Sequence, residues 1–195
     1  VQNHLCVAIP ACFDAGGRSK SGLTVAQTWR MTRPHRVIPP LDAAALDRLA
    51  LRYVERFATT RGRLTDYLNR KIRERGWDGA AADPAGLAQR MADLGYVDDR
   101  AYAEAKAAAM ARRGLGARRV AIALRQARVD EQDAEEIAPD IADRAIESAL
   151  IFARRRRIGP YGAVLPDRPM REKQLARMLR AGHRLDLSRR IVDAD

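Results

Sequence analysis

From Leu41 to the end of the chain, apolar side chains recur every three or four residues, which is the spacing of one face of an α-helix. Glycines, prolines and aspartates interrupt this pattern at short intervals. The pattern predicts helices with apolar faces at 46–57, 64–72, 87–94, 102–110, 120–124, 137–146, 149–152, 175–179 and 187–192. We therefore expect an all-α fold.

The segment LGYVDDRAYAEA, residues 94–105, predicts a joint between two helices. Gly95 suits the left-handed conformation just past a helix end, and Asp98 suits the N-cap of the next helix. A short glycine-containing turn also begins a helix-turn-helix DNA reader. Such a reader would bring Asp98 and Asp99 to the DNA phosphates, which would repel them. We therefore interpret the segment as a joint between helical modules.

A weak internal repeat follows from the same pattern. TTRGRLTDYLNRKI at 59–72 aligns with ARRGLGARRVAIAL at 111–124 at an offset of 52, and a further offset of 55 places Leu175 on Val120. Modules this small bury little surface alone, so we expect three three-helix modules stacked into an elongated array. The predicted parts are an N-terminal extension at 1–40 and modules at 41–80, 81–132 and 133–195, the last with a basic C-terminal part.

Residues 1–40 lack helical periodicity and contain Gly16 and Gly17, so we expect them to be largely disordered. They make a poor signal peptide, because they have neither a charged n-region nor a continuous apolar core. MTRPHRVIPPLD begins at Met31, and our hypothesis is that translation naturally starts there. No segment has the length of uninterrupted apolar sequence that a membrane span needs, and we expect a cytoplasmic protein without membrane contact.

Charge is concentrated at the two ends of the chain. The net charge is +11, with +4 in residues 1–40, zero in 41–150 and +7 in 151–195. A basic C-terminal part suits a polyanion such as nucleic acid. The alternative is an arginine-rich composition that serves no particular partner.

Two groups of arginines are the candidate binding residues. The run Arg154, Arg155, Arg156 and Arg157 spreads over more than one helical turn, so one acid cannot pair with all four, whereas DNA phosphates could. The second group flanks the glycines of GLG at 114–116, which would let the backbone approach a partner. Its members are Arg112, Arg113, Arg118 and Arg119.

Catalytic, metal and cofactor sites are not predicted. The acidic run DEQDAEE, 130–136, would place Glu135 and Ile141 where a calcium loop needs a glycine and a glutamate, so we interpret Asp133 and Glu136 as a capping pair. No zinc pattern surrounds Cys6 and Cys12. The histidines lie far apart without partners at motif spacing: His4, His35 and His183.

LGYVDDRAYAEAKAAAMARRGLGARRVAIALRQARV, residues 94–129, resembles the central pattern of the RecX family, regulators of the RecA recombinase. ALRYVERFATTRGRLTDYLNRKIRERG at 50–76 is similar to the family's N-terminal module. ARRRRIGPYG and REKQLARMLRAGHRLDLSRRIVD are similar to the C-terminal module of its alphaproteobacterial branch. Two departures are Thr60, where a serine or a similar small polar residue is usual, and Ala123, where many members carry an acid.

The resemblance, over roughly residues 41–193, implies a protein without catalysis that lies in the groove of the RecA–single-stranded-DNA filament. It would restrain filament growth and inhibit ATP hydrolysis and strand exchange in DNA repair and the SOS response. DNA phosphates would be weaker partners, no cofactor would be needed, and we expect a monomer. The alternative is a basic architectural protein that binds DNA without RecA.

Overall fold

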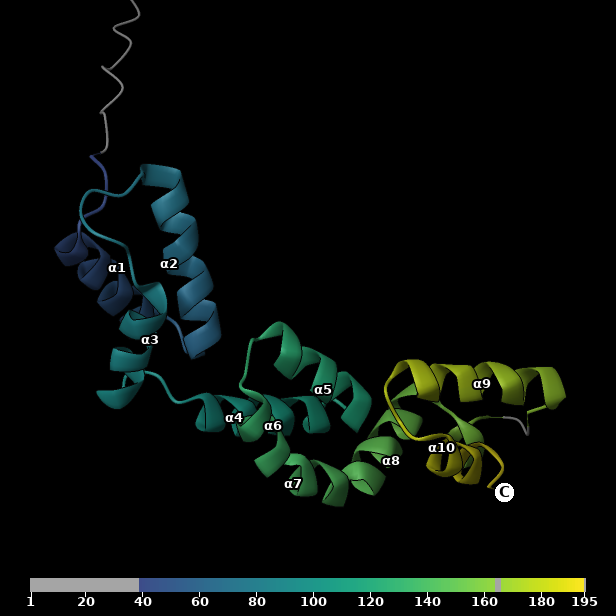
Figure 1. Ribbon diagram of the computed structural model, residues 1–195. Coiled ribbons are helices and arrows are strands. Elements are labelled where there is room, and N and C mark those ends of the chain that lie inside the picture. The colour runs from purple at the N-terminus through teal and green to yellow at the C-terminus, as the bar shows by residue number, and fades with distance from the viewer. Residues whose placement is uncertain (1–38, 164–165, 195) are drawn as a thin grey trace, which may run out of the picture. The chain divides into compact units, whose positions relative to one another are not determined.

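The computed structural model describes residues 39–163 and 166–194. Within these ranges the chain forms ten α-helices and the short 3₁₀ helix η1, which confirms the predicted all-α class (Figure 1). An isolated parallel bridge joins Leu41 to Trp77. The predicted disorder of 1–40 and the start at Met31 fall, except for residues 39 and 40, outside the described residues.

The elements follow one another along the chain as α1 (Ala43–Arg56), α2 (Arg61–Arg75), α3 (Pro84–Asp93), α4 (Asp99–Arg112), α5 (Ala117–Gln126), α6 (Glu131–Glu136), α7 (Ala138–Asp143), α8 (Ala145–Arg156), η1 (Gly159–Tyr161), α9 (Arg168–Arg180) and α10 (Leu185–Val192). No helix among the described residues is both long and apolar enough to cross a membrane.

Aspartates set several helix starts. The side chain of each accepts a hydrogen bond from the backbone N–H three residues further on, at Asp42, Asp83, Asp98 and Asp167. Each such cap contributes about 1 kcal/mol to helix stability. Gly95 adopts a φ of 78° just past the end of α3. The predicted joint at 94–105 is therefore confirmed.

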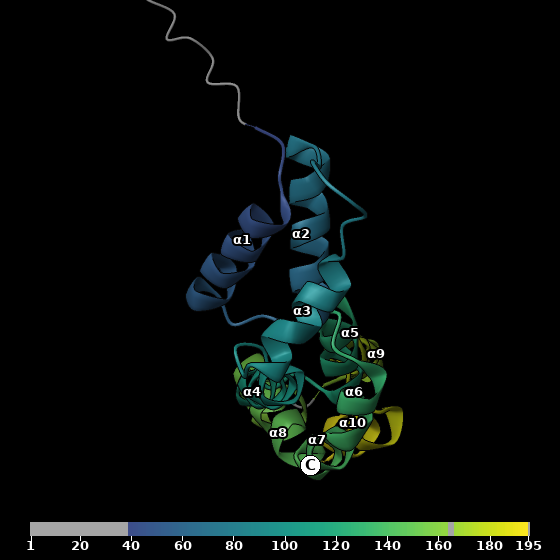
Figure 2. The same ribbon diagram turned by 60° about the vertical axis from the view of Figure 1, so that its left-hand side comes forward.

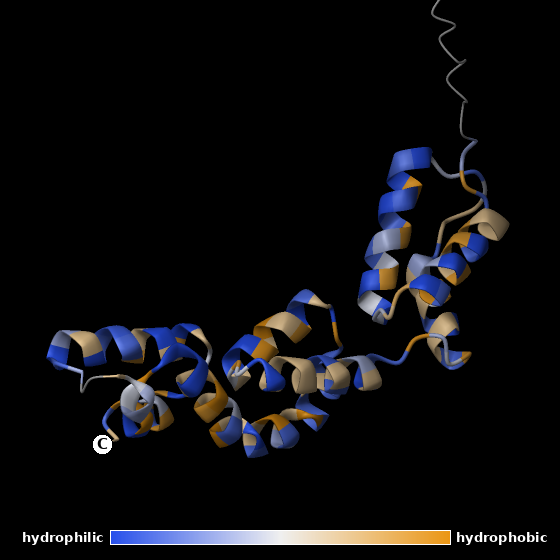
Figure 3. Cartoon of the chain, turned by 180° about the vertical axis from the view of Figure 1, so that it is seen from behind, coloured by the Kyte–Doolittle hydropathy of each residue, from blue (hydrophilic) through white to orange (hydrophobic). Residues whose placement is uncertain are grey.

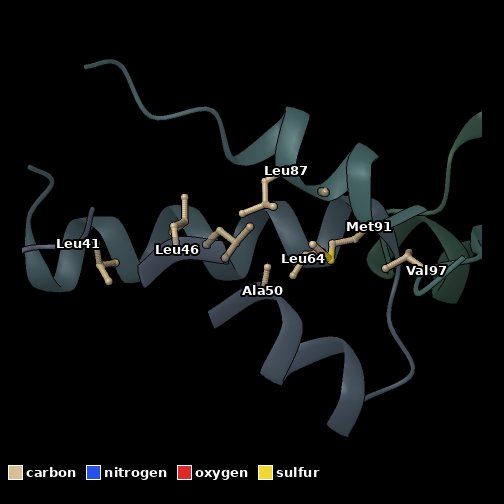
Figure 4. Packing of buried hydrophobic residues seen from close by; sticks show 9 residues of the cluster. Leu41, Leu46, Ala50, Leu64, Leu87, Met91 and Val97 are labelled. Carbon is tan, nitrogen blue, oxygen red and sulfur yellow. The ribbon is translucent and has the colours of Figure 1, made fainter. Parts of the chain in front are cut away.

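The first hydrophobic cluster joins α1, α2 and α3, which lie side by side in both ribbon views (Figures 1 and 2). Figure 4 shows its side chains converging between the helices. In Figure 3, α2 carries a narrow hydrophobic stripe on a largely hydrophilic helix. The buried residues of α2 are Leu64 and Leu68, both fully buried, and truncating either to alanine would cost about 2–5 kcal/mol.

Two further clusters account for the rest of the chain. The second joins α4, α5 and the α6–α7 segment around Ala103, Ala107, Met110, Val120, Leu124 and Ile137. The third joins α8, α9 and α10 around Ala149, Ala153, Ile158, Met178, Ile191 and Val192. Within the described ranges the apolar residues are thus buried in three separate small cores.

The clusters divide the chain at other points than the predicted boundaries at 80 and 132. Helix α3 packs with α1 and α2 through Leu87 and Met91, and Val97 closes that cluster. Ile137, after α6, packs with the second cluster. Asp83 and Pro84 mark the start of a helix, and that signal does not identify the module to which the helix belongs.

The repeat is real but its predicted offset is wrong by one helical turn. Thr60 is the N-cap of α2 and Gly116 that of α5, which is an offset of 56. The same offset relates the buried pairs Leu64 to Val120 and Leu68 to Leu124. Shifting a helix by four residues keeps the same face apolar, so the apolar pattern alone could not distinguish 52 from 56.

The second helix of each module meets the second helix of the next module end to end. We call the contact between α2 and α5 the first junction and that between α5 and α9 the second junction. At the first junction, the hydroxyl of Thr60 at the start of α2 donates to the carbonyl of Ala127 at the end of α5. At the second junction, the N–H of Gly116 at the start of α5 donates to the carbonyl of Ala181 at the end of α9, at 2.9 Å. Both contacts satisfy end groups that a helix leaves without an internal partner.

Candidate nucleic-acid interface

The arginine run at the end of α8 divides between two surfaces. Arg154, Arg155 and Arg156 form the last turn of α8, and Arg157 caps it with a left-handed φ of 54°. The guanidinium of Arg154 lies 5.4 Å from the ring centre of Tyr161, and that of Arg156 lies 5.9 Å from that of Phe152. All four are exposed, and their charges also complement the C-terminal end of the helix dipole.

The central arginines are also distributed over more than one surface. Arg112 lines a hollow with Arg144 and Glu147, so an acid is close to it. Arg113 caps α4 and is exposed, as is the side chain of Arg118. Arg119 lines a hollow together with a member of the α8 run, Arg156.

Arg119 and Arg156 line one hollow of about 410 Å³ between α5, α8 and α9. We call it the arginine hollow, and its lining residues are Leu115, Arg119, Phe152, Arg156, Arg177, Arg180 and Ala181. The lining includes no acid, and none of its four arginines forms an ion pair with an acid in the described part of the chain. A hollow with these properties favours an anion.

Arg177 and Arg180 were not among the predicted residues. They lie three residues apart on α9 and so face the same side of that helix. Their spacing is the sequence signal that could have found them, but it is far less conspicuous than four adjacent arginines. Phe152, which ends the apolar face predicted at 149–152, packs partly against the third cluster and also lines the arginine hollow.

Glycines in the α4–α5 turn bring the walls of the arginine hollow together. Gly114 has a φ of 75°, and a Cβ on it would lie 2.7 Å from the backbone nitrogen of Phe152. A Cβ on Gly116 would overlap the carbonyl of Gly182. The predicted close approach at GLG therefore exists, but within the described residues it is made to α8 and to the α9–α10 turn of the same chain.

His183 contacts the α4–α5 turn through a buried hydrogen bond. It lies between α9 and α10 as predicted, but its side chain is buried, and its Nε2 donates to the carbonyl of Gly114 at 3.1 Å. Burial lowers the pKa of His183 below its ordinary value, and the bond to Gly114 opposes this only in part. The imidazole is therefore neutral at pH 7 and adds no charge to the arginine hollow.

The arginine at the first junction is in a different situation. Arg61 donates to the buried carboxylate of Asp99 through its backbone N–H at 2.8 Å, and its guanidinium pairs with Asp99 and Asp133. Burial raises the pKa of Asp133, although Arg61 acts in the opposite direction. Arg61 is thus neutralised by two acids and does not offer its charge to a partner.

The predicted capping pair of Asp133 and Glu136 is wrong. Asp130 caps α6 by accepting from the N–H of Gln132, while Asp133 lies inside the helix and binds Arg61. Among the residues that the structure describes, no group of three or more metal-binding side chains is arranged to hold an ion. Cys6, Cys12, His4 and His35 lie outside those residues.

Fold and site together define an all-helical protein of three small modules, with an arginine-lined hollow at the second junction.

The family model for the second three-helix domain of RecX matches residues 98–137, which span α4 to α6. Two relatives, each named Regulatory protein RecX, come from Myxococcus xanthus and Agrobacterium fabrum. The first is 30% identical over 177 residues, which is 84% of this chain and 90% of the relative. The second is 29% identical over 147 residues, covering 73% of this chain and 79% of the relative. The chain belongs to the RecX family, a family of regulatory proteins.

Proposed function

We propose that this protein binds the RecA–single-stranded-DNA filament and inhibits RecA's ATPase and strand-exchange activities in DNA repair and the SOS response. It acts by occupying the filament, without chemistry of its own and without a cofactor. Membership of the RecX family is the observation that carries this proposal. The distribution of charge along the third module supports it.

Cations that have no internal partner are what a phosphate-bearing groove would require. The third module offers the arginines at the end of α8, and the second offers those around GLG, whereas the first module uses Arg61 in internal ion pairs. Each phosphate that such arginines neutralise releases counterions, which makes binding strongly salt-dependent. The predicted arginines, Arg154–Arg157 and Arg112, Arg113, Arg118 and Arg119, remain our proposed contact residues, although they lie on more than one surface.

The same arginines suit a protein that coats bare DNA without RecA, and one titration separates the two functions. The rate of ATP hydrolysis by RecA on single-stranded DNA is measured as the full chain is added. We expect strong inhibition at concentrations well below that of RecA, because one regulator that blocks a filament end or groove affects many subunits. Inhibition that begins only when the protein saturates the DNA would instead support the architectural function.

A charge-matched pair of variants tests the arginine surface. Replacing Arg154, Arg155 and Arg156 with glutamine removes three charges from α8, and we expect at least a tenfold loss of inhibition, or about 1.4 kcal/mol. The control replaces three exposed arginines of α1 in the same way: Arg48, Arg52 and Arg56. Equal losses in both variants would mean that only net charge matters and that the α8 surface makes no specific contact.

A further inference from the structure

The arginine hollow combines two properties that a plain phosphate-binding surface does not need. Part of its lining is cationic, with arginines from three helices of two modules: Arg119, Arg156, Arg177 and Arg180. The remaining lining is apolar, with Leu115, Phe152 and Ala181. A duplex presents phosphates but keeps its bases stacked inside, so it would leave the apolar part unused. A single strand can offer a phosphate and an unpaired base together.

The size of the hollow and the packing of its aromatic side chain suit such a ligand. Its volume of about 410 Å³ is at the lower end of the range typical of small-molecule sites. Leu115 and Phe152 are half-buried, so each exposes part of its side chain. The tilted ring of His183, whose centre lies 5.5 Å from that of Phe152, supports the aromatic side chain from the interior.

We propose that the arginine hollow holds one nucleotide of a single DNA strand, with a backbone phosphate on the arginines and the base against Leu115 and Phe152. This rests on the proposed function, which it makes more specific by assigning the DNA contact to the second junction. Arg177 and Arg180 carry the phosphate contact together with the predicted Arg119 and Arg156. The site is complete only when the second and third modules are docked, because each contributes part of the lining.

The test uses binding of the full chain to fluorescent DNA, followed by anisotropy without RecA. The ligands are a short oligothymidylate, the same strand with abasic positions, and a duplex of the same length. Losing the base contact should weaken binding about tenfold, since a base on an aromatic side chain contributes about 1–3 kcal/mol. Wild-type protein that binds the abasic strand as tightly as the oligothymidylate would overturn the proposal that a base is held.

Two variants separate the contribution of the phosphate contact from that of the base contact. Replacing Arg177 and Arg180 with glutamine should weaken all three ligands about tenfold or more, and should reduce the salt slope by about 0.7 for each single-strand phosphate released. Phe152→Leu keeps an apolar side chain and should remove only the preference for the normal strand over the abasic one. Circular dichroism and thermal melting establish that both variants are folded.

The control again replaces exposed arginines of α1, Arg48 and Arg52, with glutamine. If this variant loses as much affinity as the α9 variant, the arginine hollow is not the site. The RecA ATPase titration is scored separately. Inhibition of RecA by a protein that fails the abasic test would uphold the proposed function and reject the nucleotide site. A preference for the normal strand over the abasic one, without any effect on RecA, would uphold the nucleotide site and reject the proposed function.

Discussion

At the first junction the N-terminus of α2 is held by side chains, and at the second junction the corresponding N-terminus of α5 is held by backbone groups. The hydroxyl of Thr60 donates to the carbonyl of Ala127. The carboxylate of Asp99 accepts from the backbone N–H of Arg61, and the guanidinium of Arg61 pairs with Asp99 and Asp133. At the second junction the N–H groups of Gly116 and Arg118 donate to the carbonyls of Ala181 and Gly182, at 2.9 and 3.2 Å.

This difference shows how the same end-to-end helix contact leaves arginines available at one junction and uses an arginine internally at the other. Both junctions need a close backbone approach, since a Cβ on Gly62 would overlap Arg128 just as one on Gly116 would overlap Gly182. The first junction uses its arginine in internal ion pairs, so we expect it to lose stability when a charge is removed. The second junction needs no charged side chain to close, so the arginines around it remain available to a partner.

The largest effect is expected from Gly116→Ala at the second junction. Gly116 has an ordinary φ of −80°, so alanine brings no backbone strain, but its Cβ would overlap the carbonyl of Gly182. Because only backbone can move away, we expect a loss of about 2–3 kcal/mol in the free energy of unfolding. Urea unfolding measures the loss, and hydrogen exchange of the Arg118 N–H shows whether the second junction has opened.

Gly95→Ala is the control for Gly116→Ala. A Cβ at Gly95 meets nothing within 4 Å, but the φ of 78° is unfavourable for alanine and should cost about 1–2 kcal/mol. The Arg118 N–H should keep its protection in this variant. If Gly116→Ala leaves that N–H as well protected as Gly95→Ala does, the second junction does not depend on close backbone packing.

A smaller effect, confined to the first junction, is expected from Asp99→Asn. Asparagine keeps the shape and an acceptor for the N–H of Arg61 but removes the buried negative charge. Losing a charged hydrogen bond of this kind should cost about 1–2 kcal/mol. We expect the Arg61 N–H to exchange about tenfold faster, with no change at the Arg118 N–H.

Asp66→Asn removes the acid of a second ion pair across the same junction, with Arg128, and serves as the matched control. Both side chains of that pair are more than half exposed, so its loss should cost less than about 0.5 kcal/mol. High salt should further weaken the Asp66–Arg128 pair and have much less effect on Asp99. Equal effects of the two substitutions would show that burial of Asp99 is not what strengthens the first junction.

The fold was largely predictable because helix starts and stops are local. Asp83, Asp98 and Gly95 perform the roles that their residue types favour, and the contacts involved span only a few residues. Module boundaries were not predictable in this way. They depend on which apolar faces meet, and α3 could have packed with the helices on either side of it.

The candidate site was predictable only in part, for a related reason. A run of arginines is visible in the sequence, but adjacent residues on a helix point in different directions, so Arg154 and Arg156 lie against different aromatic rings. Arg119, Arg156 and Arg177 are brought together by the second junction. The backbone contacts of that junction join residues more than 60 positions apart, such as Gly116 and Ala181, and leave no local pattern in the sequence.

The smallest expected effect is a difference in the response of the two junctions to pH. Burial lowers the pKa of His183 in the folded protein, whereas in the unfolded chain it is about 6.5. Above that pH both states are neutral and stability is unaffected. Below it the unfolded state binds the proton first, so the second junction should lose stability as the pH falls from 7 to 5. Burial raises the pKa of Asp133, so the folded protein takes up that proton before the unfolded chain does, and the first junction should gain stability from that group as the pH falls.

Protection factors of the Arg118 and Arg61 N–H groups, corrected for intrinsic exchange at each pH, measure the two junctions in one sample. We expect protection at Arg118 to fall between pH 7 and 5, whereas that at Arg61 should not fall. His183→Gln is the informative variant, because its amide can still donate to the carbonyl of Gly114 but cannot take up a proton. It should abolish the pH dependence at Arg118. A dependence that survives the substitution would place the titrating group elsewhere and remove His183 from the account of the second junction.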